Sequence, residues 1–250
     1  MGFNFFIGGH QLHFSFQQLF RLLRALVLRY AAHYPFASGS HSALEQLSPL
    51  TNSVHLVMEK EKLVQFLQHT GLVSFENALQ IAEVFNEKTI VKNDLFLKED
   101  RISNEYLFLE TGFMRSFAFD TNGNEVTTDF YASNAVVFEV SSFFNRTISK
   151  ENIQALTDCN GWSITYKELN DLFHSMPAFR EFGRSVLVKG FASLKNRMLS
   201  TITKTAEERY EKLVANNPEI FQFAPLKHIA SYLGITDTSL SRIRKDFTKK

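Results

Sequence analysis

Close to the C-terminus lies a run of short polar and basic side chains whose chemistry suits the reading of duplex DNA. Hydroxyl and carboxylate groups can hydrogen-bond to base edges, while arginine and lysine can bond to guanine or neutralise phosphates. The members of this run are Thr236, Asp237, Thr238, Ser239, Ser241, Arg242 and Lys245. Because the short polar groups come first, we expect the start of the segment to meet bases and its end to meet phosphates.

Two short helices joined by a tight turn are predicted to position these side chains, over residues 225–247. In the first helix Ile229, Ala230 and Leu233 share one face. A residue as small as Ala230 lets the second helix approach closely. Gly234 follows, and glycine accepts the positive φ that is needed to leave a helix.

The second helix is expected to begin at Thr236 or Asp237, either of which can cap it by accepting a backbone N–H. Leu240, Ile243 and Phe247 then recur at helical spacing and are expected to face inward. This spacing is typical of a DNA-binding helix-turn-helix. The alternative interpretation is an ordinary helical hairpin with a solvated basic face.

The charge of the whole chain restricts any nucleic-acid role to a local patch. The chain has 250 residues, enough for one to three domains and a sizeable core, and a net charge of +1. The C-terminal end is locally cationic, as a DNA-binding end needs to be. Between residues 240 and 250, only Asp246 opposes Arg242, Arg244, Lys245, Lys249 and Lys250.

Several kinds of chemistry are not expected. Cys159 is the only cysteine, so neither an intrachain disulfide nor a four-cysteine iron–sulfur site can form. We interpret Cys159 as a small buried hydrophobe and expect a reducing, cytoplasmic environment. The sequence has no nucleophile–base motif, no paired metal ligands and no G-x-x-x-x-G-K phosphate loop. We therefore expect no enzymatic activity, no metal and no cofactor.

Residues 1–57 differ in composition from the rest of the chain. They hold no lysine, although the chain has fifteen, and they hold five of the eight histidines. Met58 then begins a lysine- and glutamate-rich stretch typical of a true protein start. We expect residues 1–57 to have no fixed structure, or to be upstream sequence read in frame from a mistaken start. The apolar run from Leu19 to Tyr34 is too short and too charged to span a membrane. A membrane-surface helix is the alternative there.

The middle of the chain is predicted to be a small antiparallel β-roll of the jelly-roll type. Two helical segments are expected between Met58 and Phe85, after which the apolar period changes to two. Asn122–Gly123, which suits a primed turn, predicts a hairpin. Short strands joined by hairpins indicate such a roll, and with the helices around it they give an α+β fold class. The expected strands are 89–91, 95–97, 106–109, 113–119, 125–131, 136–140, 152–157 and 162–164.

A long helix is predicted to follow the roll. After a short helix at 166–175, Pro177 is a favourable first residue for a helical pattern that runs to about Thr203. The apolar residues of this pattern form a stripe wider than a single seam, so the helix has more than one surface to cover. We expect one side to pack on the roll and the other on a second copy of the chain, with a plain core helix as the alternative. Thr205 and Glu208 then form a capping box that starts another helix.

This order of elements resembles the Crp/Fnr superfamily of bacterial transcription factors over about Met58 to Lys250. The most specific match is A-E-E-R-Y-E-K-L followed by P-L-K-H-I-A-S-Y-L-G-I-T-D-T-S-L-S-R-I-R-K, which is similar to the Bacteroidetes-type branch. The resemblance implies a cyclic-nucleotide-binding-like roll over 58–176, a dimerisation helix over 177–203 and a winged helix-turn-helix over 204–250. It implies a cytoplasmic homodimer, not associated with a membrane, that inserts two helices into double-stranded DNA and contacts RNA polymerase.

The family pattern departs from this sequence at two places. Asp237 and Thr238 stand where the activator often has a basic-then-acidic pair, so we expect a different target sequence, while Arg242 matches an arginine that can pair bidentately with guanine. In the roll, Glu139 matches the family's glutamate, but Phe138 replaces the preceding glycine.

The arginine that should neutralise a cyclic phosphate is also displaced. Arg146 lies several residues before the family's position, and a buried phosphate would lack its main counter-charge. We expect the roll not to bind cyclic AMP or cyclic GMP, and we single out Glu139, Ser141 and Ser142 for contact with any other effector. The alternative function is a cyclic-nucleotide-binding regulatory module that acts through protein contacts.

Overall fold

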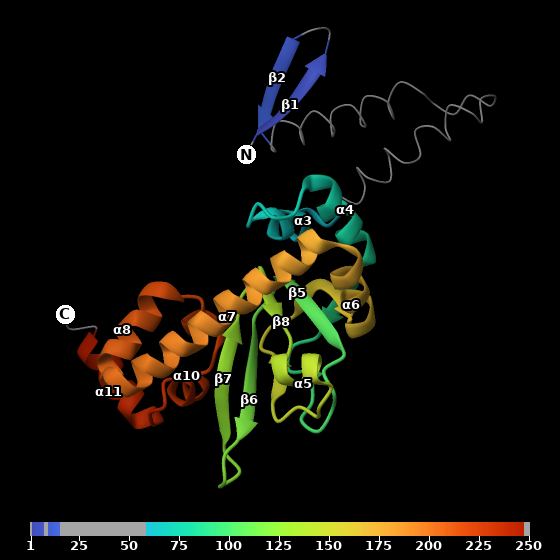
Figure 1. Cartoon of the computed structure of the whole chain (residues 1–250). Coiled ribbons are helices and arrows are strands. Elements are labelled where there is room, and N and C mark those ends of the chain that lie inside the picture. The colour runs from blue at the N-terminus through green and yellow to red at the C-terminus, as the bar shows by residue number, and fades with distance from the viewer. Residues whose placement is uncertain (1, 8–9, 16–58, 248–250) are drawn as a thin grey trace, which may run out of the picture. The chain divides into compact units, whose positions relative to one another are not determined.

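The computed structural model describes residues 2–7, 10–15 and 59–247, and it divides into two compact units, Met1–Glu61 and Lys62–Lys250 (Figure 1). In the first unit, strands β1 (Gly2–Ile7) and β2 (His10–Ser15) pair antiparallel. The sequence did not predict this pairing, because residues 1–57 were expected to have no fixed structure. For residues 16–57 that prediction lies outside the described residues.

Two four-stranded antiparallel sheets form the roll, which confirms the predicted α+β fold class. One sheet has the order β3-β10-β5-β8 and the other the order β4-β9-β6-β7. The strands are β3 (Asn86–Ile90), β4 (Leu95–Leu97), β5 (Glu105–Thr111), β6 (Met114–Phe119), β7 (Glu125–Tyr131), β8 (Ala135–Val137), β9 (Asn152–Ala155) and β10 (Cys159–Thr165). As predicted, the turn at Asn122–Gly123 joins β6 to β7.

Strand β5 is buried on both faces. Leu107 and Leu109 belong to the core between the sheets, whereas Tyr106 and Phe108 belong to a second core under the helices. The second core is covered by α3 (Glu61–Gln68) and α4 (Phe75–Val84), the two helices expected from the sequence. On β10, a Cβ added at Gly161 would lie 2.2 Å from the Phe108 carbonyl oxygen, so this close strand approach requires glycine.

A short helix, α5 (Val140–Asn145), follows β8 where the sequence predicted a strand over 136–140. The strand ends at Val137 because Glu139 caps the helix with its own side chain. Arg146 then leaves the helix with a φ of 56°, in the left-handed region. The predicted strand was wrong beyond Val137. The capping carboxylate of Glu139 starts a helix there, and the apolar pattern of the sequence does not reveal such a cap.

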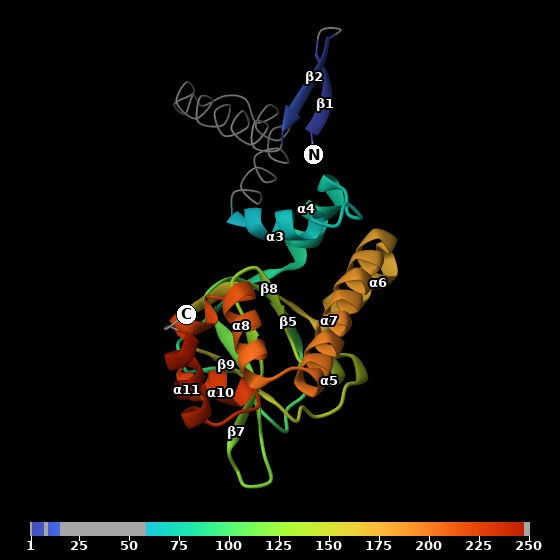
Figure 2. The same cartoon turned by 90° about the vertical axis from the view of Figure 1, so that its left-hand side faces the viewer.

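The long helix is present with the predicted bounds. After α6 (Tyr166–Ser175), helix α7 (Pro177–Thr203) runs beside the roll to the C-terminal helices (Figures 1 and 2). Its first turns are anchored by Phe179 and Phe182, which are buried in the core under the helices. Beyond that anchor its large apolar side chains are exposed: Leu187, Val188, Phe191, Leu194, Met198, Leu199 and Ile202.

The regular secondary structure of the C-terminal region is entirely helical over its described residues. It contains α8 (Ala206–Asn216), α9 (Ile220–Phe223), α10 (Leu226–Tyr232) and α11 (Asp237–Phe247). The predicted capping box of Thr205 and Glu208 begins α8. No strand occurs between residues 204 and 247, so the predicted wing is not found there, because the segments between these helices are too short to hold two paired strands.

Within the ranges that the structure describes, every helix lacks the combination of length and apolar character that a membrane span requires.

Candidate functional site

The side chains singled out for DNA contact come together at the start and along one face of α11. Gly234 has a φ of 67° and turns the chain between α10 and α11, as predicted. Thr236 is the residue that caps α11, since its Oγ1 accepts from Ser239 N at 3.2 Å. Thr236 Oγ1 also lies 3.0 Å from Thr238 Oγ1 and donates to Ser239 Oγ at 2.9 Å. The hydroxyls are therefore clustered at the N-terminus of the helix.

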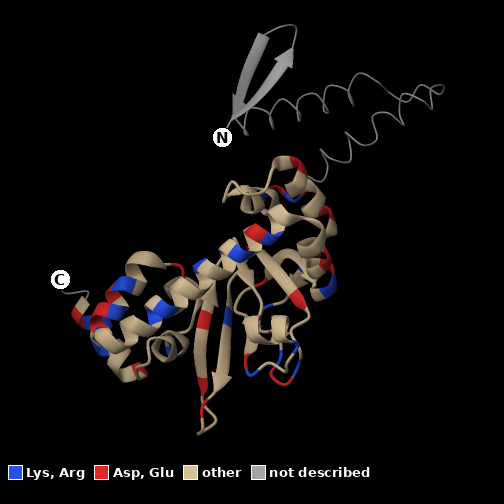
Figure 3. Cartoon of the chain, viewed as in Figure 1, with Lys and Arg blue, Asp and Glu red and all other residues tan. Residues whose placement is uncertain are grey.

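The rest of the polar face points to solvent. Asp237, Ser241, Arg242 and Lys245 are exposed, while Leu240 and Ile243 on the opposite face are buried against the other C-terminal helices. Acidic and basic residues are mixed over these helices, so the cationic character is local (Figure 3). The exposed face can offer hydrogen-bond donors and acceptors first and guanidinium or ammonium groups farther along.

Helix α10, which precedes the turn, is docked on the roll. His228 is buried, and its Nδ1 lies 2.8 Å from Nη1 of Arg115 on β6. Burial and the neighbouring charges of Arg115 and Lys227 lower the pKa of His228 to about 4. The ring is therefore neutral at physiological pH. Sequence reasoning did not identify this contact, because its two partners are 113 residues apart.

The three effector candidates lie together at α5, but their polar groups are engaged within the chain. Glu139 accepts from Ser141 N at 3.0 Å and from Ser142 N at 2.5 Å. Ser142 is fully buried; its Oγ accepts from Ser103 N and donates to the Thr147 carbonyl. A helix N-terminus is a natural place for a phosphate. Here a carboxylate of the same chain occupies it.

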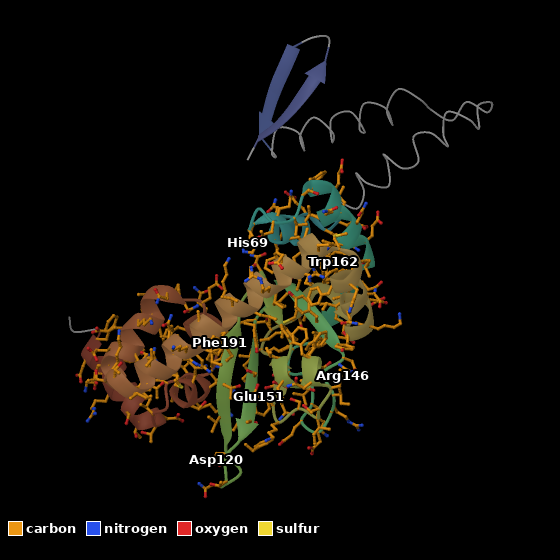
Figure 4. All side chains as sticks on the ribbon, viewed as in Figure 1. His69, Asp120, Arg146, Glu151, Trp162 and Phe191 are labelled. Carbon is orange, nitrogen blue, oxygen red and sulfur yellow. The ribbon has the colours of Figure 1, made fainter. Side chains whose placement is uncertain are left out.

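The guanidinium nearest to α5 is also committed. Arg146 donates to the carbonyl oxygens of Ser103 and Phe143 at 2.9 and 3.1 Å, and it also bonds to Asn104. Its guanidinium carbon lies 4.2 Å from the centre of the Tyr166 ring. These contacts tie Arg146 (labelled in Figure 4) to the wall of the roll rather than to a bound phosphate.

Carboxylates gather near the effector candidate Glu139. Burial raises the pKa of Glu151, and the neighbouring charges of Glu139 and Asp129 raise it further. Burial likewise raises the pKa of Asp129, against the opposing charge of Arg197. Figure 4 labels Glu151 between the β6–β7 hairpin and α5. This concentration of negative charge disfavours a cyclic phosphate.

A crevice of about 750 Å³ runs along α7 beside this region. Its walls come from β7, β8, α7, α8 and the end of α10. Its charged residues are Asp129, Lys189, Arg197, Arg209 and Lys212. Sequence reasoning missed this crevice, because its walls come from elements that are far apart along the chain. In the described residues, no three His, Cys, Asp or Glu side chains are arranged to hold a metal ion.

Comparisons with known proteins agree with this architecture. Residues 87–176 match the family model of the cyclic nucleotide-binding domain. No curated protein matches the chain.

Several solved structures share the fold at low identity. FixK2 from Bradyrhizobium japonicum is 18% identical with a TM-score of 0.58, covering 66% of this chain and 85% of its own. A putative transcriptional regulator of the crp/fnr family from Eubacterium rectale is 13% identical with a TM-score of 0.59, covering 74% and 88%. The c-di-GMP responsive global regulator CLP of Xanthomonas campestris is 13% identical with a TM-score of 0.54, covering 67% and 88%.

Proposed function

We propose that the chain is a cytoplasmic, sequence-specific DNA-binding transcriptional regulator of the Crp/Fnr type that acts as a homodimer. The observation that carries the proposal is the exposed polar and cationic face of α11, presented after a glycine turn on a docked partner helix. The fold shared with a described crp/fnr regulator supports the same assignment.

Helix α11 has the order of groups expected for entering a major groove. The hydroxyls of Thr236, Thr238 and Ser239 cluster at its N-terminus. Farther along, Arg242 can pair bidentately with guanine O6 and N7, and Lys245 can neutralise a phosphate. Asp237 and Ser241 complete the face and can accept or donate to neighbouring base edges.

The exposed stripe on α7 supports assembly into a dimer. Leu187, Phe191, Leu194, Met198 and Ile202 recur at steps of four, three, four and four residues, close to the period of a two-stranded coiled coil. Phe191 and Ile202 are 70% and 72% exposed, which is costly for an apolar seam without a partner. In the dimer the two α11 helices would reach two half-sites, and RNA polymerase would be the further partner.

The roll is proposed not to bind cyclic AMP or cyclic GMP. The carboxylate of Glu139 occupies the α5 N-terminus, and the contacts of Arg146 are made with the roll itself. The match to the cyclic nucleotide-binding domain favours a second candidate, a nucleotide-responsive module that acts through protein contacts. Titration with fluorescent cyclic AMP separates the two, since we expect no saturable signal and the second candidate requires one.

Selection of duplexes from a random pool by the purified protein tests the main proposal. We expect an inverted repeat whose half-site centres lie about one helical turn apart. Arg242→Ala should then cost about 1–3 kcal/mol at a single base position and relax specificity there. Lys245→Ala is the matched comparison, with a loss spread evenly over sequences. Recovery of no enriched duplex would contradict the proposal.

A further inference from the structure

We propose that Arg115 and Arg197 are positioning residues that lock the DNA-reading helices onto the roll at a fixed orientation. The inference rests on the proposed function, because an orientation matters only if α11 reads DNA. It concerns neither the reading face of α11 nor the α7 stripe. It concerns the joint where β6, β7, α7 and α10 meet.

Arg115 lies at the centre of this joint and is almost entirely enclosed. Its side chain is 3% exposed, so its charge must be matched inside the protein. Its N–H groups reach Glu125 at 2.5 Å, Thr127 at 3.4 Å, His228 at 2.8 Å, and Gln154 at 3.2 and 2.9 Å. These are five contacts for the five N–H donors of a guanidinium.

One of these contacts crosses from the roll to the DNA-reading helices. Arginine has no acceptor, so Nδ1 of His228 must be the unprotonated acceptor of this hydrogen bond. A guanidinium whose five N–H donors are all satisfied requires each acceptor to lie at a defined position. Because Glu125, Thr127 and Gln154 hold the guanidinium on the roll, its remaining N–H defines where His228 lies.

A bulge in β7 provides the second set of contacts. The pairing of β6 with β7 shifts between Ser116 and Phe117, which leaves Thr128 as the extra residue. The neighbouring Thr127 N donates to Ser231 Oγ on α10 at 3.1 Å. The Thr128 carbonyl accepts from Arg197 of α7.

Arg197 closes the joint from the side of α7. Its guanidinium carbon lies 5.0 Å from the centre of the Tyr232 ring on α10, and that ring lies 5.1 Å from the Phe130 ring on β7. Arg197 therefore touches the bulge and α10 at once. The long helix, the roll and the DNA-reading pair therefore meet at this joint.

The orientation of α10 sets that of α11. Ile229 and Ala230 of α10 share one core with Leu240 and Ile243 of α11, so the two helices move as a unit. A dimer must engage two half-sites simultaneously, and linked sites gain about 10²-fold or more in affinity only when geometry permits both contacts. With a loosened joint, each α11 could still read its half-site, but the two α11 helices of the dimer would no longer be held at a fixed separation.

The experiment compares full-length variants on three duplexes: the selected inverted repeat, the same repeat with two extra central base pairs, and a single half-site. Wild-type protein should prefer the correct spacing by at least about tenfold. His228→Leu and Arg197→Ala should reduce that preference to about threefold or less, with half-site affinity nearly unchanged. His228→Gln, which keeps an acceptor for Arg115, should retain the preference.

Lys195→Ala is the charge-matched control, since Lys195 is an exposed cation on the same helix as Arg197. Ser231→Ala is a milder variant that removes one hydroxyl and keeps the core, so it reports on the joint if another variant fails to fold. Wild-type spacing preference in His228→Leu, Arg197→Ala and Ser231→Ala would overturn the inference alone. A wild-type protein that selects no duplex would instead overturn the proposed function, and the inference with it.

Discussion

At the scale of single residues, burial first and then the charge of Arg115 explain why His228 is uncharged at physiological pH. Burial disfavours the charged ring most, the neighbouring cations Arg115 and Lys227 disfavour it further, and the carboxylates of Glu125 and Asp237 only partly oppose them. The net result is a pKa near 4, so the folded protein accepts this proton far less readily than the unfolded chain.

The stability of the protein is therefore expected to fall on acidification through this site. Between pH 6.5 and 4 the unfolded chain carries the His228 proton and the folded chain does not, so the contribution is complete above pH 6.5 and shrinks below it. The loss is at most about 3 kcal/mol. Urea unfolding at pH 7 and pH 4 measures it.

His228→Gln is the control for this pH effect, because glutamine keeps an acceptor and does not titrate. The loss between pH 7 and pH 4 should be smaller in the variant, while Asp129 and Glu151 contribute equally to both proteins. Parallel curves for the wild type and the variant would contradict the assignment of the effect to His228.

The features that could be predicted from the sequence were those set by residues close together along the chain. Asn122–Gly123, the Thr205–Glu208 capping box and Gly234 were predictable because each depends on neighbours within a few positions. The cap on α5 was not predicted, because Glu139 looked like a ligand-binding residue. The contact of Arg115 with His228 joins residues 113 positions apart, and no sequence periodicity reports such a pairing.

At the scale of elements, the turn between α10 and α11 depends on one backbone conformation. Gly234 has a φ of 67°, and an added Cβ would meet no atom within 4 Å. Gly234→Ala should therefore destabilise the protein by about 1–2 kcal/mol through backbone strain alone. Gly234→Asn should cost less, since asparagine tolerates this region. Urea unfolding compares the two, and equal costs would argue against this origin.

Helix α7 is the element on which we propose that dimerisation depends. Phe191→Asp or Met198→Asp would place a carboxylate in the apolar seam, where desolvation is costly. We expect self-association to weaken by at least about 100-fold, as measured by sedimentation equilibrium. Asn196→Asp is the matched control, because Asn196 is exposed on the side of α7 opposite to the seam. A dimer that survives both seam substitutions would contradict this role of α7.

At the scale of the whole molecule, DNA binding should depend on salt in proportion to the number of phosphates that both protomers neutralise. The slope of log K against log salt is about −0.9 per phosphate contact. We expect the slope for Phe191→Asp, a monomer, to be about half that of the wild type. Equal slopes would mean that one protomer makes all the phosphate contacts.

The architecture of the molecule was more predictable than its connections. The order of roll, long helix and C-terminal helices followed from apolar period and turn residues, and the bounds of α7 matched residue for residue. The absence of a wing between residues 204 and 247 and the bulge at Thr128 were not foreseen, since both depend on what packs against a segment. Contact of α11 with DNA stays a prediction.

The bulge in β7 also bears on the engineering of chimeric regulators. Three residues of α10 make specific contacts with the rest of the molecule. Ser231 bonds to the bulged strand β7, His228 to Arg115 on β6, and Tyr232 stacks with Arg197 on α7. Transplanting α8–α11 onto a foreign sensor would discard half of these matched surfaces. Hybrids that carry the β6–β7 hairpin and the end of α7 along with the transplanted helices are the ones that should keep working.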